Sequence, residues 1–360
     1  MKSMAKKVAK FFAVLLSLAL GLFAYNYLRF GVFWVPQETV AFESEPGIVI
    51  RGTLLKPAKD GPFPAVVILH GSGPETRDEI SYRIMANVLV RSGLAVLLYD
   101  KRGSGESDGE FASAQYVDFV ADATAAVAYL ADRQDIDGDR VGLLGNSESG
   151  WLTPEIAWRT GQVDFIFNRA GPPLSWRDNV IWEVRNDLLA DGVEHSQLEP
   201  ILAHTRRRWN YYVAAASDPA LATGPERAGI GDELKRLRAE VPAARRRLPE
   251  ELAPYDATTY AADAEVYGYD PRMFLEKIDV PMLYVFAEND INVPTEESVA
   301  FLEGFRRDYD KNIEIVVLEG VGHAMAGWRG LLTAGYVPEF IELLADWPAG
   351  QVVNSARSSP

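Results

Sequence analysis

Short, mostly apolar runs recur along this chain and constrain its fold more than any other feature. They fall at residues 65–69, 94–98, 141–144, 165–167, 282–286 and 313–318. Such runs are typical of strands that are buried on both faces. Segments with helical spacing separate the first four runs, at residues 80–91, 116–131 and 147–158. Alternating strands and helices predict an α/β fold with a doubly wound, mainly parallel sheet.

The alternation stops in the middle of the chain. Residues 175–276 contain amphipathic helical stretches and no clear strand pattern, so we expect a helical lid inserted into the sheet. The core then comprises residues 37–174 and 277–348, opened by strands at 39–42 and 48–55 and closed by a helix at 337–346. We expect a separate N-terminal segment, 1–36, and a flexible polar tail, 349–360.

The N-terminal segment has the pattern of a membrane anchor or a signal peptide. Its apolar stretch, residues 11–28, follows four basic residues: Lys2, Lys6, Lys7 and Lys10. As a helix it would be about 27 Å long, at the short end of what spans a hydrocarbon core of about 30 Å. The lysines predict a cytoplasmic N-terminus and an exported body in the cell envelope. We favour a single-pass anchor over a cleaved signal peptide and a secreted or periplasmic product, because no good cleavage site follows.

The composition excludes several classes of function. The chain has no cysteine, which excludes disulfide scaffolds, thiolate catalysis and cysteine-based metal sites. Its net charge of −15 makes it a poor nucleic-acid binder. Only four histidines occur, and neither a metal-ligand pattern nor a phosphate-binding loop is present. We therefore expect no metal, no cofactor and no nucleic-acid partner.

Three sets of candidate catalytic residues each follow a predicted strand, where ligands bind in parallel sheets. Residues 145–150 read Gly-Asn-Ser-Glu-Ser-Gly, and residues 70–74 read His-Gly-Ser-Gly-Pro. The third set is a pair of late loops, of which 287–294 contains Asp290 and 320–324 contains His323. A serine nucleophile needs an imidazole base, and that imidazole needs a carboxylate to orient it. Each residue alone has an ordinary structural explanation, such as a helix cap or an Asx turn, but together they favour catalysis.

These motifs resemble those of the α/β-hydrolase family. Residues 145–150 resemble its nucleophile elbow, with Ser149 at the second glycine position of G-x-S-x-G. Residues 70–74 resemble its oxyanion loop, and 99–107, Tyr-Asp-Lys-Arg-Gly-Ser-Gly-Glu-Ser, resemble a further loop that is usually structural. The order Ser, Asp, His is also that of the family. The resemblance covers residues 38–173 and 279–347 and does not extend to the insertion.

The resemblance implies a role for each residue. Ser147 would be the nucleophile, His323 the base and Asp290 the orienting acid. The backbone N–H groups of Ser72 and Glu148 would form the oxyanion hole. Ser149 is a lower-ranked alternative nucleophile, and Glu288 is the alternative acid. We expect His70 to be a structural, hydrogen-bonded histidine.

The leading hypothesis is a serine hydrolase that cleaves the carboxylic ester of a small acyl substrate through an acyl-enzyme. A thioesterase or an aminopeptidase-like serine peptidase would use the same residues. The peptidase would also need an acid to bind the substrate amine, for which the candidates are Glu148, Glu183, Glu250 and Glu251. A non-enzymatic alternative is a membrane-tethered binding protein on a hydrolase fold, which a broken triad would indicate.

The insertion contains two further groups of residues with open roles. Its aromatic residues either line an acyl pocket or pack between helices: Trp176, Trp182, Trp209, Tyr211 and Tyr212. The arginine runs 206–208 and 245–247 either bind an acidic ligand, such as a coenzyme A phosphate or anionic lipid headgroups, or lie on solvated helix faces. We favour the second interpretation of the arginines.

Overall fold

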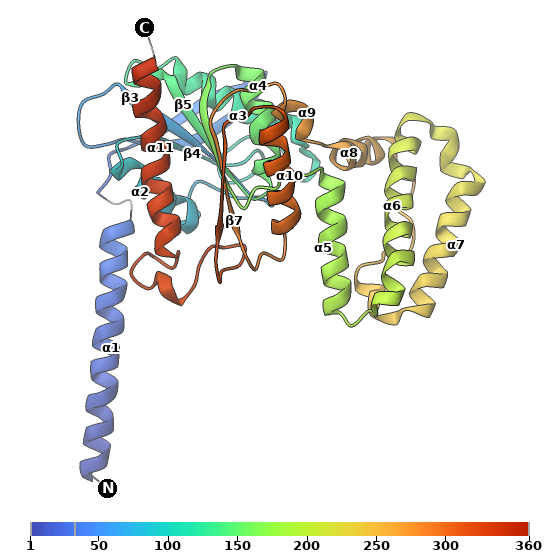
Figure 1. Ribbon diagram of the computed structural model, residues 1–360, viewed down its shortest axis with the longest axis horizontal. Coiled ribbons are helices and arrows are strands. Elements are labelled where there is room, and N and C mark those ends of the chain that lie inside the picture. Colours follow the sequence, from blue (N-terminus) through green and yellow to red (C-terminus); the bar gives the residue numbers. More distant parts are fainter. Residues whose placement is uncertain (1, 32–33, 359–360) are drawn as a thin grey trace.

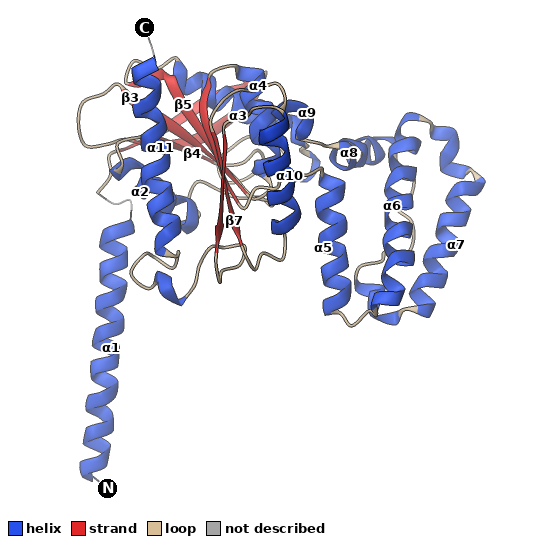
Figure 2. Cartoon of the chain, viewed as in Figure 1, coloured by secondary structure: helices blue, strands red, loops and turns tan. Residues whose placement is uncertain are grey.

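The computed structural model describes residues 2–31 and 34–358, and within them an eight-stranded sheet forms the core (Figures 1 and 2). The strand order is β1-β2-β4-β3-β5-β6-β7-β8. Pairs β1–β2 and β2–β4 are antiparallel and the remaining pairs are parallel, which confirms the mainly parallel sheet. The strands are β1 (Gln37–Glu45), β2 (Ile48–Leu55), β3 (Phe63–Leu69), β4 (Ala95–Tyr99), β5 (Ile136–Asn146), β6 (Val163–Arg169), β7 (Met282–Ala287) and β8 (Ile313–Leu318).

Helices cover both faces of the sheet. On one face lie α2 (Ile80–Arg91) and α11 (Pro338–Ser358), and on the other lie α3 (Tyr116–Ala131), α4 (Ser149–Thr160) and α10 (Thr295–Asp308). Each face has its own apolar cluster, so the central strands are buried on both sides. Short 3₁₀ turns occur at Phe111–Ser113, Pro219–Thr223, Pro242–Arg246 and Trp328–Gly330.

The C-terminal helix is longer than the sequence suggested. The expected helix ended at residue 346 and a flexible tail began at 349, but α11 continues to Ser358. Val352 is buried in the same apolar cluster as Leu344, two turns earlier on the same helix face. This contact continues the apolar stripe and stabilises the additional turns.

The insertion between β6 and β7 is helical, as the sequence predicted. It contains α5 (Trp176–Ala190), α6 (His195–Ser217), α7 (Pro225–Glu240), α8 (Ala257–Gly268) and the short α9 (Arg272–Leu275). Helices α5 to α8 enclose an apolar cluster of their own, separate from the two clusters of the sheet. In Figure 1 this helical block projects from one side of the sheet. Whether it acts as a lid stays a prediction.

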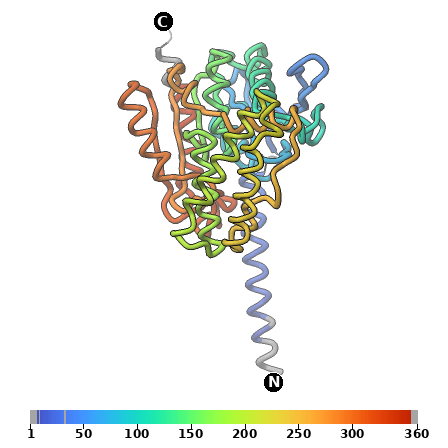
Figure 3. The backbone as a smooth tube through the Cα atoms, turned by 90° about the vertical axis from the view of Figure 1, so that its right-hand side faces the viewer, coloured from blue at the N-terminus to red at the C-terminus, as the bar shows by residue number. Residues whose placement is uncertain are grey.

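The N-terminal helix α1 (Lys2–Phe30) extends below the body in two perpendicular views (Figures 1 and 3). Its segment Lys10–Phe30 is long and apolar enough to cross a membrane, as a signal anchor or a signal peptide would be. Its last turns contact the body. Phe30 is buried, and Asn26 both donates to the Leu331 carbonyl (2.8 Å) and accepts from the Ala334 N–H (2.8 Å).

Candidate active site

Ser147 lies at the sharp turn between β5 and α4. Its φ angle is +52°, in the left-handed region that residues other than glycine rarely adopt. A side chain at Gly145 would place its Cβ 2.4 Å from Asn168 Oδ1, and one at Gly150 would place it 2.3 Å from Gly171 Cα. Both positions therefore favour glycine, because the turn is packed tightly against the end of β6 and the loop that follows it.

Ser149, the alternative nucleophile, has a structural place in this turn. Its hydroxyl accepts from the Asn146 N–H (2.7 Å) and lies 3.1 Å from the Asn146 carbonyl oxygen. The side chain is buried and does not line the cavity that contains Ser147. Serine fits the second glycine position of the motif because its hydroxyl holds the turn closed.

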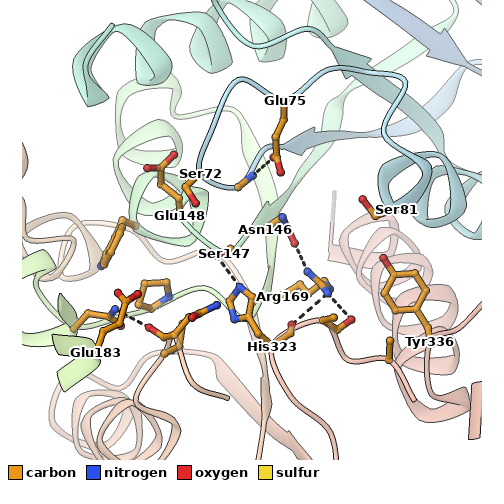
Figure 4. A pocket seen from close by; sticks show the side chains of 18 of the residues that line it. Ser72, Glu75, Ser81, Asn146, Ser147, Glu148, Arg169, Glu183, His323 and Tyr336 are labelled. Carbon is orange, nitrogen blue, oxygen red and sulfur yellow. Dashed lines mark hydrogen bonds between the residues drawn. The ribbon is translucent and has the colours of Figure 1, made fainter. Parts of the chain in front are cut away.

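The structure brings Ser147, His323 and Asp290 together from three separate loops. Ser147 Oγ lies 2.9 Å from His323 Nε2, and His323 Nδ1 lies 2.8 Å from Asp290 Oδ2 (Figure 4 shows the first contact). The Asp290 side chain is fully buried, and its Oδ1 also accepts from the N–H groups of Asn292 (2.8 Å) and Val293 (3.1 Å). These bonds fix the carboxylate, which in turn fixes the orientation of the imidazole.

Glu288, the alternative acid, lies elsewhere. Its carboxylate accepts from the Gly320 N–H (2.8 Å) and so bridges the two late loops at the surface. Asp290, and not Glu288, is the carboxylate that contacts His323. Asp290 also matches the D-x-x-V-P loop of the α/β-hydrolase family, which the sequence resembles, better than Glu288 does.

The two residues expected to supply oxyanion donors, Ser72 and Glu148, line the same cavity as Ser147. No acceptor for either backbone N–H lies among the residues that the structure describes. The neighbouring Gly71 N–H, in contrast, is occupied by the Glu75 carboxylate (2.7 Å) and the Tyr82 hydroxyl (2.9 Å). The structure thus leaves the N–H groups of Ser72 and Glu148 available to an incoming oxygen atom.

Lys101 links the two segments that are expected to supply the oxyanion donors, a contact that the sequence did not reveal. Its buried ammonium donates to the Gly71 carbonyl (2.9 Å) and to the Glu148 carboxylate (2.8 Å), and it lies 4.3 Å from the Phe119 ring centroid. The Gly71 carbonyl and the Ser72 N–H belong to one peptide group. Lys101 therefore orients and polarises the amide that carries the first donor while it holds the side chain of the residue that carries the second.

Arg169, at the end of β6, is a second residue that the sequence did not single out. It donates to Asn146 Oδ1 and to the carbonyls of His323 (3.3 Å) and Ala324 (2.6 Å). Burial lowers the pKa of the guanidinium, and among the described residues no carboxylate pairs with it. It ties the turn that precedes Ser147 to the loop that carries His323. The only feature of the sequence that could have drawn attention to Arg169 is a charged residue at the end of a predicted apolar strand.

His70 is buried between the rings of Tyr82 (5.3 Å) and Tyr99 (4.7 Å). Burial and the nearby charge of Lys101 lower its pKa to about 3, although a hydrogen bond to the Tyr99 backbone opposes the shift. A histidine that stays neutral at physiological pH and does not line the cavity fits the structural role expected of it.

A cavity of about 750 Å³ surrounds Ser147 and His323. In Figure 4, Glu183 of α5 lies on one side of this pair and Ser81 and Tyr336 lie on the other. Burial raises the pKa of Glu183, as does Asp187 to a lesser degree. Of the four acids considered for binding an amine, Glu148 and Glu183 line this cavity, whereas Glu250 and Glu251 line a different one. Glu148 is already paired with Lys101.

The insertion contributes little to the cavity beyond α5. Of its five highlighted aromatic residues only Trp176 lines the cavity, and it packs against Trp209 (5.1 Å between ring centroids). Several arginines of the two runs pair with acids of the same block: Arg206 with Glu199, Arg207 with Glu233, Arg246 with Asp191 and Arg247 with Asp187. These pairs favour the interpretation of the arginines as balanced helix faces.

A mainly parallel sheet with a serine, a histidine and an aspartate at its strand ends defines a protein of the α/β-hydrolase class. The family model of the X-Pro dipeptidyl-peptidases (S15 family) matches residues 46–323, which is most of the chain. The chain therefore belongs to this family, and it is a hydrolase.

Individual relatives agree with this class. Esterase EstD of Thermotoga maritima is 27% identical over 291 residues, which are 79% of this chain and 60% of that protein. A 2-hydroxy-6-oxononadienedioate/2-hydroxy-6-oxononatrienedioate hydrolase of Paraburkholderia xenovorans is 25% identical over 73% of this chain and 81% of its own length. The structure of Est1E from Butyrivibrio proteoclasticus with bound ferulic acid shares the fold, with a TM-score of 0.55, 18% identity and coverage of 87% and 99%.

Proposed function

We propose that this protein is a serine hydrolase that cleaves carboxylic esters, with Ser147 as nucleophile, His323 as base and Asp290 as orienting acid. The observation that carries the proposal is the placement of His323 between Ser147 Oγ and a fully buried Asp290. The similarity to esterase EstD supports an ester substrate, although this chain spans about 60% of the length of that relative.

In this mechanism Ser147 Oγ attacks the ester carbonyl while His323 Nε2 takes its proton. The charge that develops on the carbonyl oxygen is stabilised by the N–H groups of Ser72 and Glu148, which Lys101 holds in place. The imidazolium then returns its proton to the departing alcohol, and an acyl-Ser147 ester remains. Water, deprotonated by His323, attacks this ester. The bond between Ser147 Oγ and the acyl carbon then breaks, the imidazolium returns its proton to Ser147 Oγ, and the carboxylic acid is released.

The test combines labelling with a substrate panel. A fluorophosphonate probe should label the full chain at Ser147, and Ser149→Ala should still be labelled while Ser147→Ala is not. Acyl esters, acyl thioesters and aminoacyl amides should then be compared at equal concentration. Labelling without turnover of any of the three classes would contradict the hydrolase assignment and favour the binding protein instead.

A second candidate, a serine peptidase that binds a free amino terminus, is favoured by Glu183. This half-buried carboxylate lines the cavity and has no ion-pair partner in the described part of the chain. The description of the matched family names X-Pro dipeptidyl-peptidases, which also favours a peptidase. Faster cleavage of aminoacyl amides than of matched esters would support this candidate.

We further propose that α1 stays attached as a single-pass anchor and places the body outside the cytoplasm. Phe30 is buried, and Asn87 donates to the Gly31 carbonyl (2.7 Å), so the end of the helix is part of the folded body. Cell fractionation with mass determination of the mature chain tests this. A soluble product that begins after residue 20 would indicate cleavage, and a soluble full-length cytoplasmic chain would contradict export.

A further inference from the structure

The loop between Ala326 and Tyr336 exposes an unusual amount of apolar surface. Trp328, Leu331 and Leu332 are 82%, 58% and 61% exposed, whereas large apolar residues in the body are mostly buried. We name residues 327–335 the apolar loop. Between residues 320 and 337 the sequence contains one arginine and no acidic residue, in a chain whose net charge is −15.

Backbone contacts hold the apolar loop in this shape. The Gly327 N–H donates to the Gly335 carbonyl (3.0 Å), and the Gly335 N–H donates to the Gly330 carbonyl (2.8 Å). A Cβ at Gly330 would lie 2.3 Å from the Gly335 carbonyl oxygen, so only glycine fits there. The loop closes on its own backbone, and its leucines remain directed to the outside.

The apolar loop is hydrogen-bonded to the candidate membrane-spanning segment of α1. Asn26 of α1 donates to the Leu331 carbonyl and accepts from the Ala334 N–H, both at 2.8 Å. Asn26 lies four residues before the end of the span at Phe30, which corresponds to about 6 Å along a helix. Segments that bind a membrane surface bury their apolar side chains about 5–10 Å deep. The exposed leucines therefore lie at the depth of the bilayer interface whenever α1 spans the bilayer.

The inner side of the same loop forms a wall of the active-site cavity. Ala334, Gly335 and Tyr336 line that wall, together with Ile80 at the start of α2. Ile80 is itself 75% exposed and so continues the apolar surface towards the cavity. In Figure 4, Tyr336 and Ser81 lie on the side of the cavity away from Glu183.

We propose that the apolar loop inserts into the outer interface of the membrane that α1 crosses, and that the cavity accepts amphiphilic esters from that interface. The proposal rests on the hydrolase function and on the retained anchor proposed above. A lipid surface is the partner that this loop fits best. The exposed apolar side chains of the loop lie beside the apolar segment of α1, and the loop lacks acidic residues, which anionic headgroups would repel. Trp328 has the side chain most typical of such interfaces.

The position of the loop can be measured without reference to activity. The chain has no cysteine, so Leu332→Cys in the full-length protein gives a single labelling site. The matched control is Val353→Cys, an equally apolar and 50% exposed position near the far end of α11. Each variant carries a nitrobenzoxadiazole label and is reconstituted into phosphatidylcholine–phosphatidylglycerol vesicles. Lipid-borne nitroxide should quench the label at 332 several-fold more than at 353, and aqueous iodide should do the reverse. Equal iodide quenching at both sites would overturn the proposal.

The consequence for substrate access is tested with the double variant Leu331→Asp/Leu332→Asp and the control Val353→Asp. Hydrolysis of a long-chain ester embedded in the same vesicles should fall about tenfold, while hydrolysis of a short water-soluble ester stays within about twofold of wild type. An equal loss on both esters, or none on the embedded ester, would overturn the proposal. If the wild type cleaves neither ester, the proposed function fails, and the quenching experiment still decides where the loop lies.

Discussion

The sheet and the helical insertion contribute to the active site in opposite ways. The sheet brings residues from the ends of five strands into direct contact, and the contacts around Ser147, His323 and Lys101 are hydrogen bonds of 2.8–2.9 Å. The insertion encloses its own apolar cluster and reaches the cavity through one face of α5, at Trp176, Asn179, Val180 and Glu183.

We expect this difference to separate the residues that carry out bond cleavage from those that select the substrate. The residues proposed for bond cleavage come from the sheet, where each is fixed by several partners. Of the α5 residues that line the cavity, Asn179 donates to the Asn292 carbonyl and Glu183 has no ion-pair partner among the described residues. We therefore expect substitutions in the sheet to lower turnover on every substrate, and substitutions in α5 to change the order of preference among substrates.

The strongest test of this separation is Ser147→Ala. Turnover should fall on the order of 10⁶-fold for all esters, because no other hydroxyl contacts His323 Nε2 in the described residues. The matched control, Ser149→Ala, loses two hydrogen bonds within the turn and should cost about 1–2 kcal/mol of stability while turnover remains measurable. Initial rates and unfolding midpoints of both variants provide the measurement. A dead Ser149→Ala beside an active Ser147→Ala would reverse the assignment.

Asp290→Asn should have the next largest effect, a loss of roughly 10⁴-fold in kcat, because an amide no longer selects the imidazole tautomer that faces Ser147. Glu288→Gln is the control, since Glu288 bridges two loops at the surface and should retain most activity. A greater loss in Glu288→Gln would move the orienting role to that residue and would contradict the observed geometry.

Lys101→Met tests whether the ammonium group of Lys101 is needed to position the two proposed oxyanion donors, the N–H groups of Ser72 and Glu148. We expect kcat to fall about 10²–10³-fold with a smaller change in KM, because misplaced donors weaken transition-state binding most. The substitution also leaves the Glu148 carboxylate without its partner, so Lys101→Met/Glu148→Gln is the necessary companion. If the double variant regains wild-type kcat, Lys101 merely neutralises Glu148 and does not position the Gly71–Ser72 peptide.

Glu183→Gln examines the insertion side of the comparison. If Glu183 binds a substrate amine, cleavage of aminoacyl amides should fall roughly ten- to hundredfold, since hydrogen bonds to charged groups contribute about 1.5–3 kcal/mol. Neutral esters and fluorophosphonate labelling should stay within about twofold. Glu250→Gln is the control, because Glu250 lines a different cavity. A uniform loss on all substrates would break the proposed division between sheet and insertion.

The same division describes what could be predicted from the sequence. The strands and the three loops around Ser147, Asp290 and His323 follow local rules of periodicity and turn chemistry, and the placement of these residues agrees with them. The positions of Lys101 and Arg169 depend on which strand ends become neighbours, so their hydrogen bonds to Gly71 and Ala324 have no local signature. The insertion offered helical spacing only. Which of its aromatic residues would reach the cavity depends on packing between helices that periodicity does not specify.

The smallest expected effect is on the pH dependence of stability, and it compares a buried histidine that follows a strand of the sheet, His70, with one of the insertion, His204. Burial lowers the pKa of His70 to about 3, whereas an unfolded chain protonates its histidines near pH 6.5. Folded His70 therefore stays neutral while the unfolded state gains a proton, so stability is lost as the pH falls from about 6.5 towards 3. The loss is at most about 1.4 kcal/mol per pH unit.

Burial also lowers the pKa of His204 in α6, but its hydrogen bond to Glu233 opposes that shift. Between pH 7.5 and 5.0 in mild detergent, the thermal midpoint of His70→Gln should thus decline less than that of the wild type, and His204→Gln should differ from the wild type by a smaller amount. If His70→Gln and the wild type decline in parallel, His70 is protonated in the folded protein, and its packing between Tyr82 and Tyr99 does not keep it neutral.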